Sequence, residues 1–242
     1  MTARNIRIVL VRPKENKNIG SVCRAMKTMG FGALYIVGHE TIDRSEAAIT
    51  AVHAVDVLDR AVRCETLEEA VQDSVLVAGF SRRRGKWRKY FALTPEQLAE
   101  RLTSIRRGTC ALVFGNEASG LNAEDLARCH IAVRIPSSPR FPSLNLSHAV
   151  QIITYLMHRR LSEPREAEGF LPISSRHLDA LVSLMIASLT NIGFFTQGDP
   201  REMSVFLRDI FARAALEQRE ADRLARVFEK ISGLIAGSRI DP

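Results

Sequence analysis

Three segments of the chain hold the residues whose types and spacing suit chemistry. Each follows a short apolar run and is rich in Gly, Pro, Asn and Ser; they are RPKENKNIGSVCRAMKTMGF (12–31), FGNEASGL (114–121) and IPSSPRFPSLNLSHAVQ (135–151). Each leads into a helical pattern, so backbone N–H groups at helix starts are offered to a ligand. Open α/β sheets bind ligands beyond the carboxyl ends of their strands. We therefore expect these segments to form one binding site.

Other kinds of site are not indicated by the sequence. The chain has no G-x-G-x-x-G after its first apolar run and no G-x-x-x-x-G-K-[ST], so it lacks the dinucleotide fingerprint and the P-loop. It also lacks G-x-S-x-G, the nucleophile elbow of serine hydrolases. The six histidines are scattered without metal-ligand spacing, and we expect no metal ion.

The elements that would position the three segments alternate along the chain. Five short apolar runs are predicted strands: Ile6–Val11, Ala33–Gly38, Val75–Phe80, Ala111–Gly115 and Ile131–Ile135. They lack polar alternation, which is typical of a parallel sheet covered on both faces. Helical patterns lie at 19–29, 46–58, 67–72, 95–105, 123–129 and 146–161. This order predicts an α/β fold with a mostly parallel sheet.

No strand is predicted beyond residue 162. Residues 162–172 are polar and end in proline, which indicates a linker, and amphipathic helices are predicted at 177–190, 203–215 and 219–235. We therefore expect an α/β domain at 1–162 and a small helical extension at 163–242.

The net charge of +7 is unevenly distributed. Residues 1–162 contain 24 Lys and Arg against 15 Asp and Glu, whereas residues 163–242 contain 10 against 12. A basic body suits a polyanionic partner. The densest positive stretch, Arg82–Lys89, includes Trp87, and cations next to an aromatic ring suit single-stranded RNA. The alternative is a solvated basic loop.

No targeting or membrane segment is evident. The apolar part of MTARNIRIVLVRP is too short for a signal-peptide core or for a membrane span. Four cysteines stand alone without a C-x-x-C pair, so we expect reduced thiols and a cytoplasmic location.

The three segments, in their order and spacing, resemble the motifs of the SpoU (TrmH-like) branch of the SPOUT superfamily. The matching patterns are N-x-G-S-x-x-R-A-M-K-T-M-G (18–30), F-G-x-E-x-x-G-L (114–121) and S-L-N-L-x-x-A-V-Q (143–151). Within that branch the chain is most similar to tRNA cytidine/uridine 2′-O-methyltransferases, whose helical extension resembles IGFF (192–195) and LRDIFARA (207–214) here.

The resemblance implies a SPOUT fold with a deep trefoil knot near the end of the α/β domain, and a homodimer. It implies S-adenosylmethionine as cofactor and 2′-O-methylation of a ribose in tRNA, at a cytidine or uridine of the anticodon loop. Two alternatives stay open. One is a ribosomal-RNA 2′-O-methyltransferase of the same family, and the other is a non-catalytic RNA-binding protein that kept the fold.

The resemblance also nominates catalytic residues. Arg24 would bind the phosphate beside the reacting ribose and stabilise the developing alkoxide, because a guanidinium stays protonated; the alternative is a surface salt bridge. Asn18 would orient the loop or the ribose, or would simply cap the helix that follows it. Glu117 would pair with Arg24 or a neighbouring donor, or would be a first-turn helix carboxylate.

The binding residues fall into two groups. The resemblance implies cofactor binding by Phe80, Ser81, Arg82, Gly115, Ile135, Pro142, Ser143, Leu144 and Asn145. The basic stretch suggests RNA binding by Arg83, Arg84, Lys86, Trp87, Arg88 and Lys89. The chain departs from the family pattern at Asn116, at Phe141-Pro142 and at Ser147-His148. Proline at 142 removes one N–H donor from the third segment.

Overall fold

The computed structural model describes residues 2–38, 41–81, 92–162, 171–195 and 199–236. Contacts divide the chain into two units, Met1–Phe170 and Leu171–Pro242. The basic stretch 82–89 and most of the expected linker lie outside the described residues. Among the described residues, no helix has the length and apolar character needed to cross a membrane.

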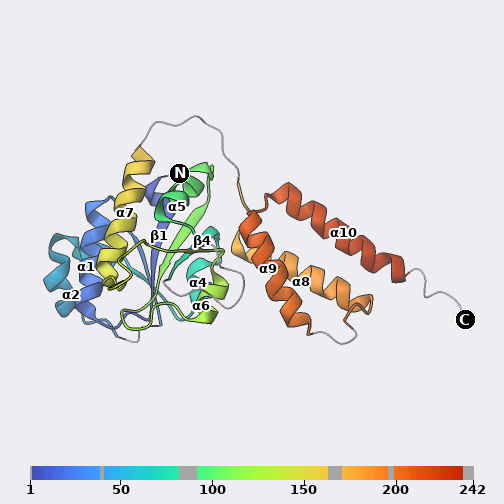
Figure 1. The fold of residues 1–242 in the computed structure, drawn as a ribbon, viewed down its shortest axis with the longest axis horizontal. Coiled ribbons are helices and arrows are strands. Elements are labelled where there is room, and N and C mark those ends of the chain that lie inside the picture. The colour runs from blue at the N-terminus through green and yellow to red at the C-terminus, as the bar shows by residue number, and fades with distance from the viewer. Residues whose placement is uncertain (1, 39–40, 82–91, 163–170, 196–198, 237–242) are drawn as a thin grey trace, which may run out of the picture. The chain divides into compact units, whose positions relative to one another are not determined.

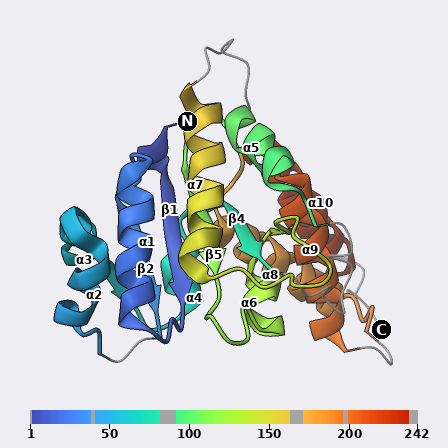
Figure 2. The same cartoon turned by 60° about the vertical axis from the view of Figure 1, so that its left-hand side comes forward.

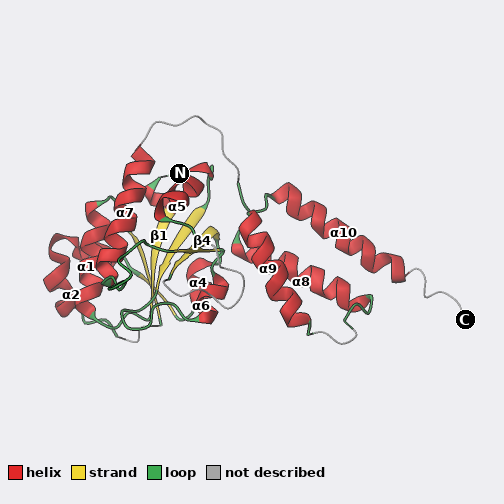
Figure 3. Cartoon of the chain, viewed as in Figure 1, coloured by secondary structure: helices red, strands yellow, loops and turns green. Residues whose placement is uncertain are grey.

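The first unit is built on a parallel sheet (Figure 3). Its strands are β1 Ile6–Val11, β2 Ala33–Val37, β3 Val62–Cys64, β4 Ser74–Phe80, β5 Thr109–Phe114 and β6 Ile131–Val133. The order across the sheet is β3-β2-β1-β5-β4-β6. The five predicted strands are confirmed, each end within two residues of the prediction. The prediction missed β3, a three-residue edge strand with little burial and therefore little apolar signal.

Helices cover both faces of the sheet. They are α1 Asn16–Thr28, α2 Arg44–Ala51, α3 Val55–Asp59, α4 Leu67–Val71, α5 Pro95–Ser104, α6 Ala123–Arg128 and α7 Leu146–Ser162. Successive strand residues point to opposite faces. Ile6, Ile8 and Leu10 pack with α1, α2, α5 and α7, whereas Val9 and Val11 pack with α4 and α6. Figures 1 and 2 show α1 and α7 side by side on the first face.

The single helix predicted for 46–58 is wrong. The chain turns at Val52, whose φ of 52° ends α2, and a 3₁₀ turn (Val52–Ala54) leads into α3. Asp43 caps α2 by accepting from the N–H groups of Ser45 and Glu46. After the break, Ala54 and the apolar residues of α3 are buried in the first-face core. Tertiary packing therefore overrides the helical periodicity here.

The second unit consists of three described helices: α8 Ser175–Asn191, α9 Pro200–Ala214 and α10 Gln218–Ala236. They share a core of their own, which includes Leu181, Met185 and Leu216. The helix stop predicted at 191–193 is confirmed, with Gly193 at a φ of 73°. Pro172, at the end of the expected linker, pairs with Glu217 in an isolated bridge.

Candidate functional site

An open pocket lies beyond the carboxyl ends of β4, β5 and β6. Its lining comes from those strand ends, the loops that follow them and the first turns of α7: Phe80, Ser81, Phe114, Gly115, Asn116, Glu117, Ala118, Ser119, Gly120, Val133, Ile135, Pro142, Ser143, Leu144, Leu146 and Ala149. Strand register places Phe80 opposite both Phe114 and Val133. The two phenyl rings stack with centroids 4.3 Å apart and give the pocket an apolar floor.

The structure gathers most of the nominated cofactor residues in this pocket. Those that line it are Phe80, Ser81, Gly115, Ile135, Pro142, Ser143 and Leu144. Asn145 does not line the pocket, and Arg82 lies outside the described residues. Ala118, Ser119 and Gly120 also line the pocket but were not among the nominated cofactor residues. Their position inside F-G-x-E-x-x-G-L was the available signal.

The loop after β5 folds back on itself and forms one wall. Asn116 Oδ1 accepts hydrogen bonds from the N–H of Ala118 (3.1 Å), the N–H of Ser119 (2.8 Å) and the Ser119 hydroxyl (3.0 Å). An asparagine commonly templates a turn in this way. A Cβ on Gly115 would lie 2.0 Å from the carbonyl carbon of Gly120, so the close approach requires glycine. The departure at Asn116 thus has a structural role in this chain.

Side chains from all three sequence segments meet behind the pocket. Asn18 Nδ2 donates to Glu117 Oε1 (2.9 Å) and to Glu15 Oε2 (3.2 Å), and Asn18 Oδ1 accepts from Asn145 Nδ2 (3.0 Å). Asn145 Oδ1 in turn accepts from the N–H of Ser147 (2.8 Å) at the start of α7. Asn18 is buried in the first turn of α1, whose N-cap is Glu15. The simple N-cap reading of Asn18 is therefore wrong.

Glu117 is held by donors from the turn that follows β1. Its Oε2 accepts from the N–H of Lys14 (3.0 Å), and its Oε1 also lies 3.4 Å from the N–H of Glu15. Burial by itself would raise the pKa of Glu117. Hydrogen bonds from its own N–H, from Asn18 and from these two N–H groups outweigh that effect and lower the pKa. Glu117 precedes α6 and is not a first-turn carboxylate; its partners are neighbouring donors.

Arg24 lies on the exposed side of α1 and outside the pocket lining. It is six residues beyond Asn18, or about 9 Å along a helix axis. Within the described part of the chain, no hydrogen bond or ion pair engages its guanidinium. The surface salt bridge considered from the sequence is thus not formed with any described residue.

No group of three or more His, Cys, Asp or Glu side chains among the described residues is arranged to hold a metal ion. The site instead offers loop amides and hydroxyls around an apolar floor, which suits an organic ligand with one flat apolar part.

The chain matches the model of the SpoU rRNA Methylase family over residues 5–155. It belongs to this family. The SpoU match spans β1 to α7 and includes the pocket and the Asn18–Glu117–Asn145 contacts.

Individual relatives extend the comparison. The tRNA (cytidine-2′-O-)-methyltransferase TrmJ of Methanocaldococcus jannaschii is 40% identical over 71% of this chain and 73% of its own. The tRNA (cytidine/uridine/adenosine-2′-O-)-methyltransferase TrmJ of Pseudomonas aeruginosa is 34% identical over 96% of this chain and 95% of its own. The crystal structure of TrmJ from Z. mobilis ZM4 superposes with a TM-score of 0.77, at 28% identity, over 93% of this chain and 98% of that one. The expected similarity to the tRNA-modifying branch of the SpoU family is confirmed.

Proposed function

We propose that this SpoU protein transfers a methyl group from S-adenosylmethionine to a ribose 2′-hydroxyl in tRNA, at a cytidine or uridine of the anticodon loop. The observation that carries the proposal is that the three family motifs meet in the structure. The second and third motifs line the pocket, and side chains of all three are hydrogen-bonded to one another through Asn18, Glu117 and Asn145. Relatives that match over most of the chain are named as tRNA 2′-O-methyltransferases.

The pocket residues fit the proposed cofactor. The stacked Phe80 and Phe114 rings and Ile135 offer an apolar surface to an adenine ring, while the loop at 115–120 offers polar groups beside it. Gly115 lets the loop close on itself at Gly120, and Gly120 adopts a φ of 69° that favours glycine. When bound, S-adenosylmethionine supplies an electrophilic methyl group on a sulfonium.

The residues of the chain position the RNA and stabilise the negative charge that develops on the reacting oxygen. We assign Arg24 to the phosphate next to the reacting ribose, in a two-pronged contact that also stabilises the alkoxide as it forms. An oxygen of that phosphate takes the proton, because the guanidinium remains charged. Asn18 and Glu117 hold the first and second motifs in register, and so act as positioning residues.

The remaining parts of the proposal rest on the SpoU resemblance and on the composition of the chain. The chain forms a homodimer with the cofactor sites near the interface, and the loops before α7 form a trefoil knot. Residues 1–162 are the methyltransferase domain and 163–242 a helical extension. Arg82 contacts the cofactor, and Arg83, Arg84, Lys86, Trp87, Arg88 and Lys89 contact RNA. The protein works in the cytoplasm.

The test is methylation of unmodified tRNA by the purified protein, followed by mass spectrometry of nucleosides. We expect 2′-O-methylcytidine or 2′-O-methyluridine in the anticodon loop. Methylation of ribosomal RNA alone would replace the proposed substrate, and cofactor binding without methylation of either RNA would indicate a binding protein.

Arg24→Ala tests the assignment of the site. We expect kcat to fall by about 100-fold or more, with S-adenosylmethionine binding unchanged, because a contact made in the transition state is lost. Lysine at 24 should rescue poorly, since a point charge lacks the two-pronged geometry. Arg107→Ala, an exposed arginine just before β5 and outside the three motifs, is the control and should stay near the wild-type rate. Wild-type activity in Arg24→Ala would overturn the assignment.

A further inference from the structure

Arg12, the first residue after β1, has a backbone conformation that is unfavourable for its type. Its φ is 50°, in the left-handed region that residues with a Cβ rarely adopt. Three contacts hold it there. Its N–H donates to Val37 O (2.8 Å), its side-chain stem packs beside Gly38, and its guanidinium pairs with Asp125.

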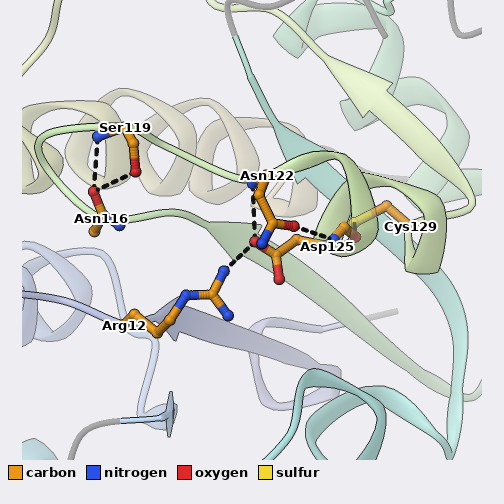
Figure 4. A network of polar contacts seen from close by, with 6 residues as sticks. All are labelled: Arg12, Asn116, Ser119, Asn122, Asp125 and Cys129. Carbon is orange, nitrogen blue, oxygen red and sulfur yellow. Dashed lines mark hydrogen bonds and ion pairs between the residues drawn. The ribbon is translucent and has the colours of Figure 1, made fainter. Parts of the chain in front are cut away.

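Asp125 receives that guanidinium at the far end of the pocket loop. Its side chain is only 6% exposed, and it lies in the first turn of α6. The same Oδ2 that Arg12 contacts also accepts from the N–H of Asn122 (2.9 Å), while the N–H of Asp125 donates to Asn122 Oδ1 (2.7 Å). Figure 4 shows Arg12, just after β1, reaching to this capping box, with the Asn116–Ser119 turn nearer the start of the same loop.

The turn after β1 therefore contacts the pocket loop at two places. Near the start of the loop, Glu117 is bonded to the N–H groups of Lys14 and Glu15. At its end, the capping box is bonded to Arg12. Residues 118–121 lie between these two contacts, and the first three of them line the pocket. Arg12 itself does not line the pocket.

We propose that Arg12 and Asp125 form a positioning pair that sets the pocket wall at 118–120 and thereby determines the affinity for S-adenosylmethionine. This inference rests on the proposed function. A pocket wall that is fixed at both ends is already in its bound conformation, so the ligand does not have to order it. If one end is freed, ordering the wall costs binding free energy and the affinity for S-adenosylmethionine falls. Asp125 is buried whereas the Arg12 side chain is 43% exposed, so removing the guanidinium would leave the carboxylate as an unpaired buried charge.

The test compares Arg12→Gln, Asp125→Asn and the double variant by calorimetric titration with S-adenosylmethionine. Asn at 125 keeps an oxygen for the Asn122 N–H, so the start of α6 is preserved. We expect each single variant to bind about tenfold more weakly, and the double variant no more weakly than the worse single, as for a coupled pair. In methylation assays KM for S-adenosylmethionine should rise about tenfold while kcat at saturation stays near wild type.

Two further variants separate positioning from general destabilisation. Arg12→Lys should recover part of the affinity, since it keeps the charge. Arg128→Gln, which removes the 3.0 Å ion pair to Glu68 at the other end of the same helix, is the matched control and should bind like wild type. Should Arg12→Gln fail to fold, Asp125→Asn carries the same comparison alone.

Affinity within about twofold of wild type in Asp125→Asn would overturn the inference, as would additive losses in the double variant. A loss of the same size in Arg128→Gln would also overturn it, because the effect would then be unspecific. A wild-type chain that binds no S-adenosylmethionine would overturn the proposed function and this inference with it.

Discussion

Asn18 occupies a place that suits only a side-chain amide. Its Nδ2 group donates to two carboxylates, Glu15 and Glu117, while its Oδ1 accepts from Asn145. Aspartate there would set a third negative charge beside the other two, and an aliphatic residue would remove both the donor to Glu117 and the acceptor for Asn145. The residue type follows from the need to donate and accept at one point.

Glu117 leads to a prediction about pH. Its pKa is lowered in the folded chain, so its contribution to stability is present above the unfolded value, about 4.3, and is lost as pH falls through the folded value. Glu117→Gln should lower the free energy of unfolding by about 1 kcal/mol at pH 7. The difference from wild type should shrink below about pH 4.3. Urea unfolding at pH 7, 5 and 3.5 measures this; a difference independent of pH would refute it.

At the scale of elements, the packing of α1 against α2 fixes the positions of Asn18 and Arg24, which both lie on α1. A Cβ on Gly20 would lie 1.9 Å from Ala47 O and 2.4 Å from Thr50 Oγ1, so α2 lies directly on the glycine. Thr50 Oγ1 also donates to Lys17 O (2.6 Å), which fixes the height of α2 along α1.

Gly20→Ala should therefore force the two helices apart. We expect a loss of about 2 kcal/mol or more in the free energy of unfolding, as in overpacked cores, and a lower methylation rate because α1 moves. Gly32→Ala is the matched control: nothing lies within 4 Å of its added Cβ. Urea unfolding and initial rates measure both variants. Equal stability of the two would contradict the packing argument.

The sequence predicted elements better than it predicted partners. Strands such as β1 were evident because burial on both faces makes them continuously apolar. The break at Val52 was not evident, since it depends on packing against α1. Motif patterns nominated Asn18 and Glu117. The N–H groups of Lys14 and Glu15 that hold Glu117 carry no residue-type signal, because every residue except proline offers one.

At the scale of the whole molecule, the α/β unit and the helical unit have separate cores. The two cores of the sheet are formed by residues before 163, and the core of α8, α9 and α10 by residues after 172. A unit with its own core can fold alone.

A chain ending at Ser162 should accordingly fold and bind cofactor. We expect cooperative thermal unfolding by circular dichroism and an affinity for S-adenosylmethionine within about threefold of the full chain. Binding of tRNA by both chains shows what the helices contribute. An aggregated or cofactor-free fragment would contradict the independence of the α/β unit.

The positive charge of the α/β unit predicts salt-dependent RNA binding. Replacing Arg83, Arg84 and Lys86 by glutamine should flatten the slope of log affinity against log salt by about 2, while cofactor affinity holds. The control replaces Arg4, Arg106 and Arg107, which are exposed at the amino ends of β1 and β5. Filter binding at several salt concentrations gives the slopes. Equal slopes for the two triple variants would contradict RNA binding by the basic stretch and would favour the alternative of a solvated loop.

The strand order also has a consequence for synthesis of the chain. β1 is made first, yet one of its edges is paired only by β5, about a hundred residues later. At ribosomal rates of about 5–20 residues per second, that edge waits for roughly 5–20 s. An apolar strand with open N–H and C=O groups is a template for pairing with other chains. The nascent protein is thus most exposed to aggregation before Thr109–Phe114 emerge, and chaperone capture during that interval should govern its yield in cells.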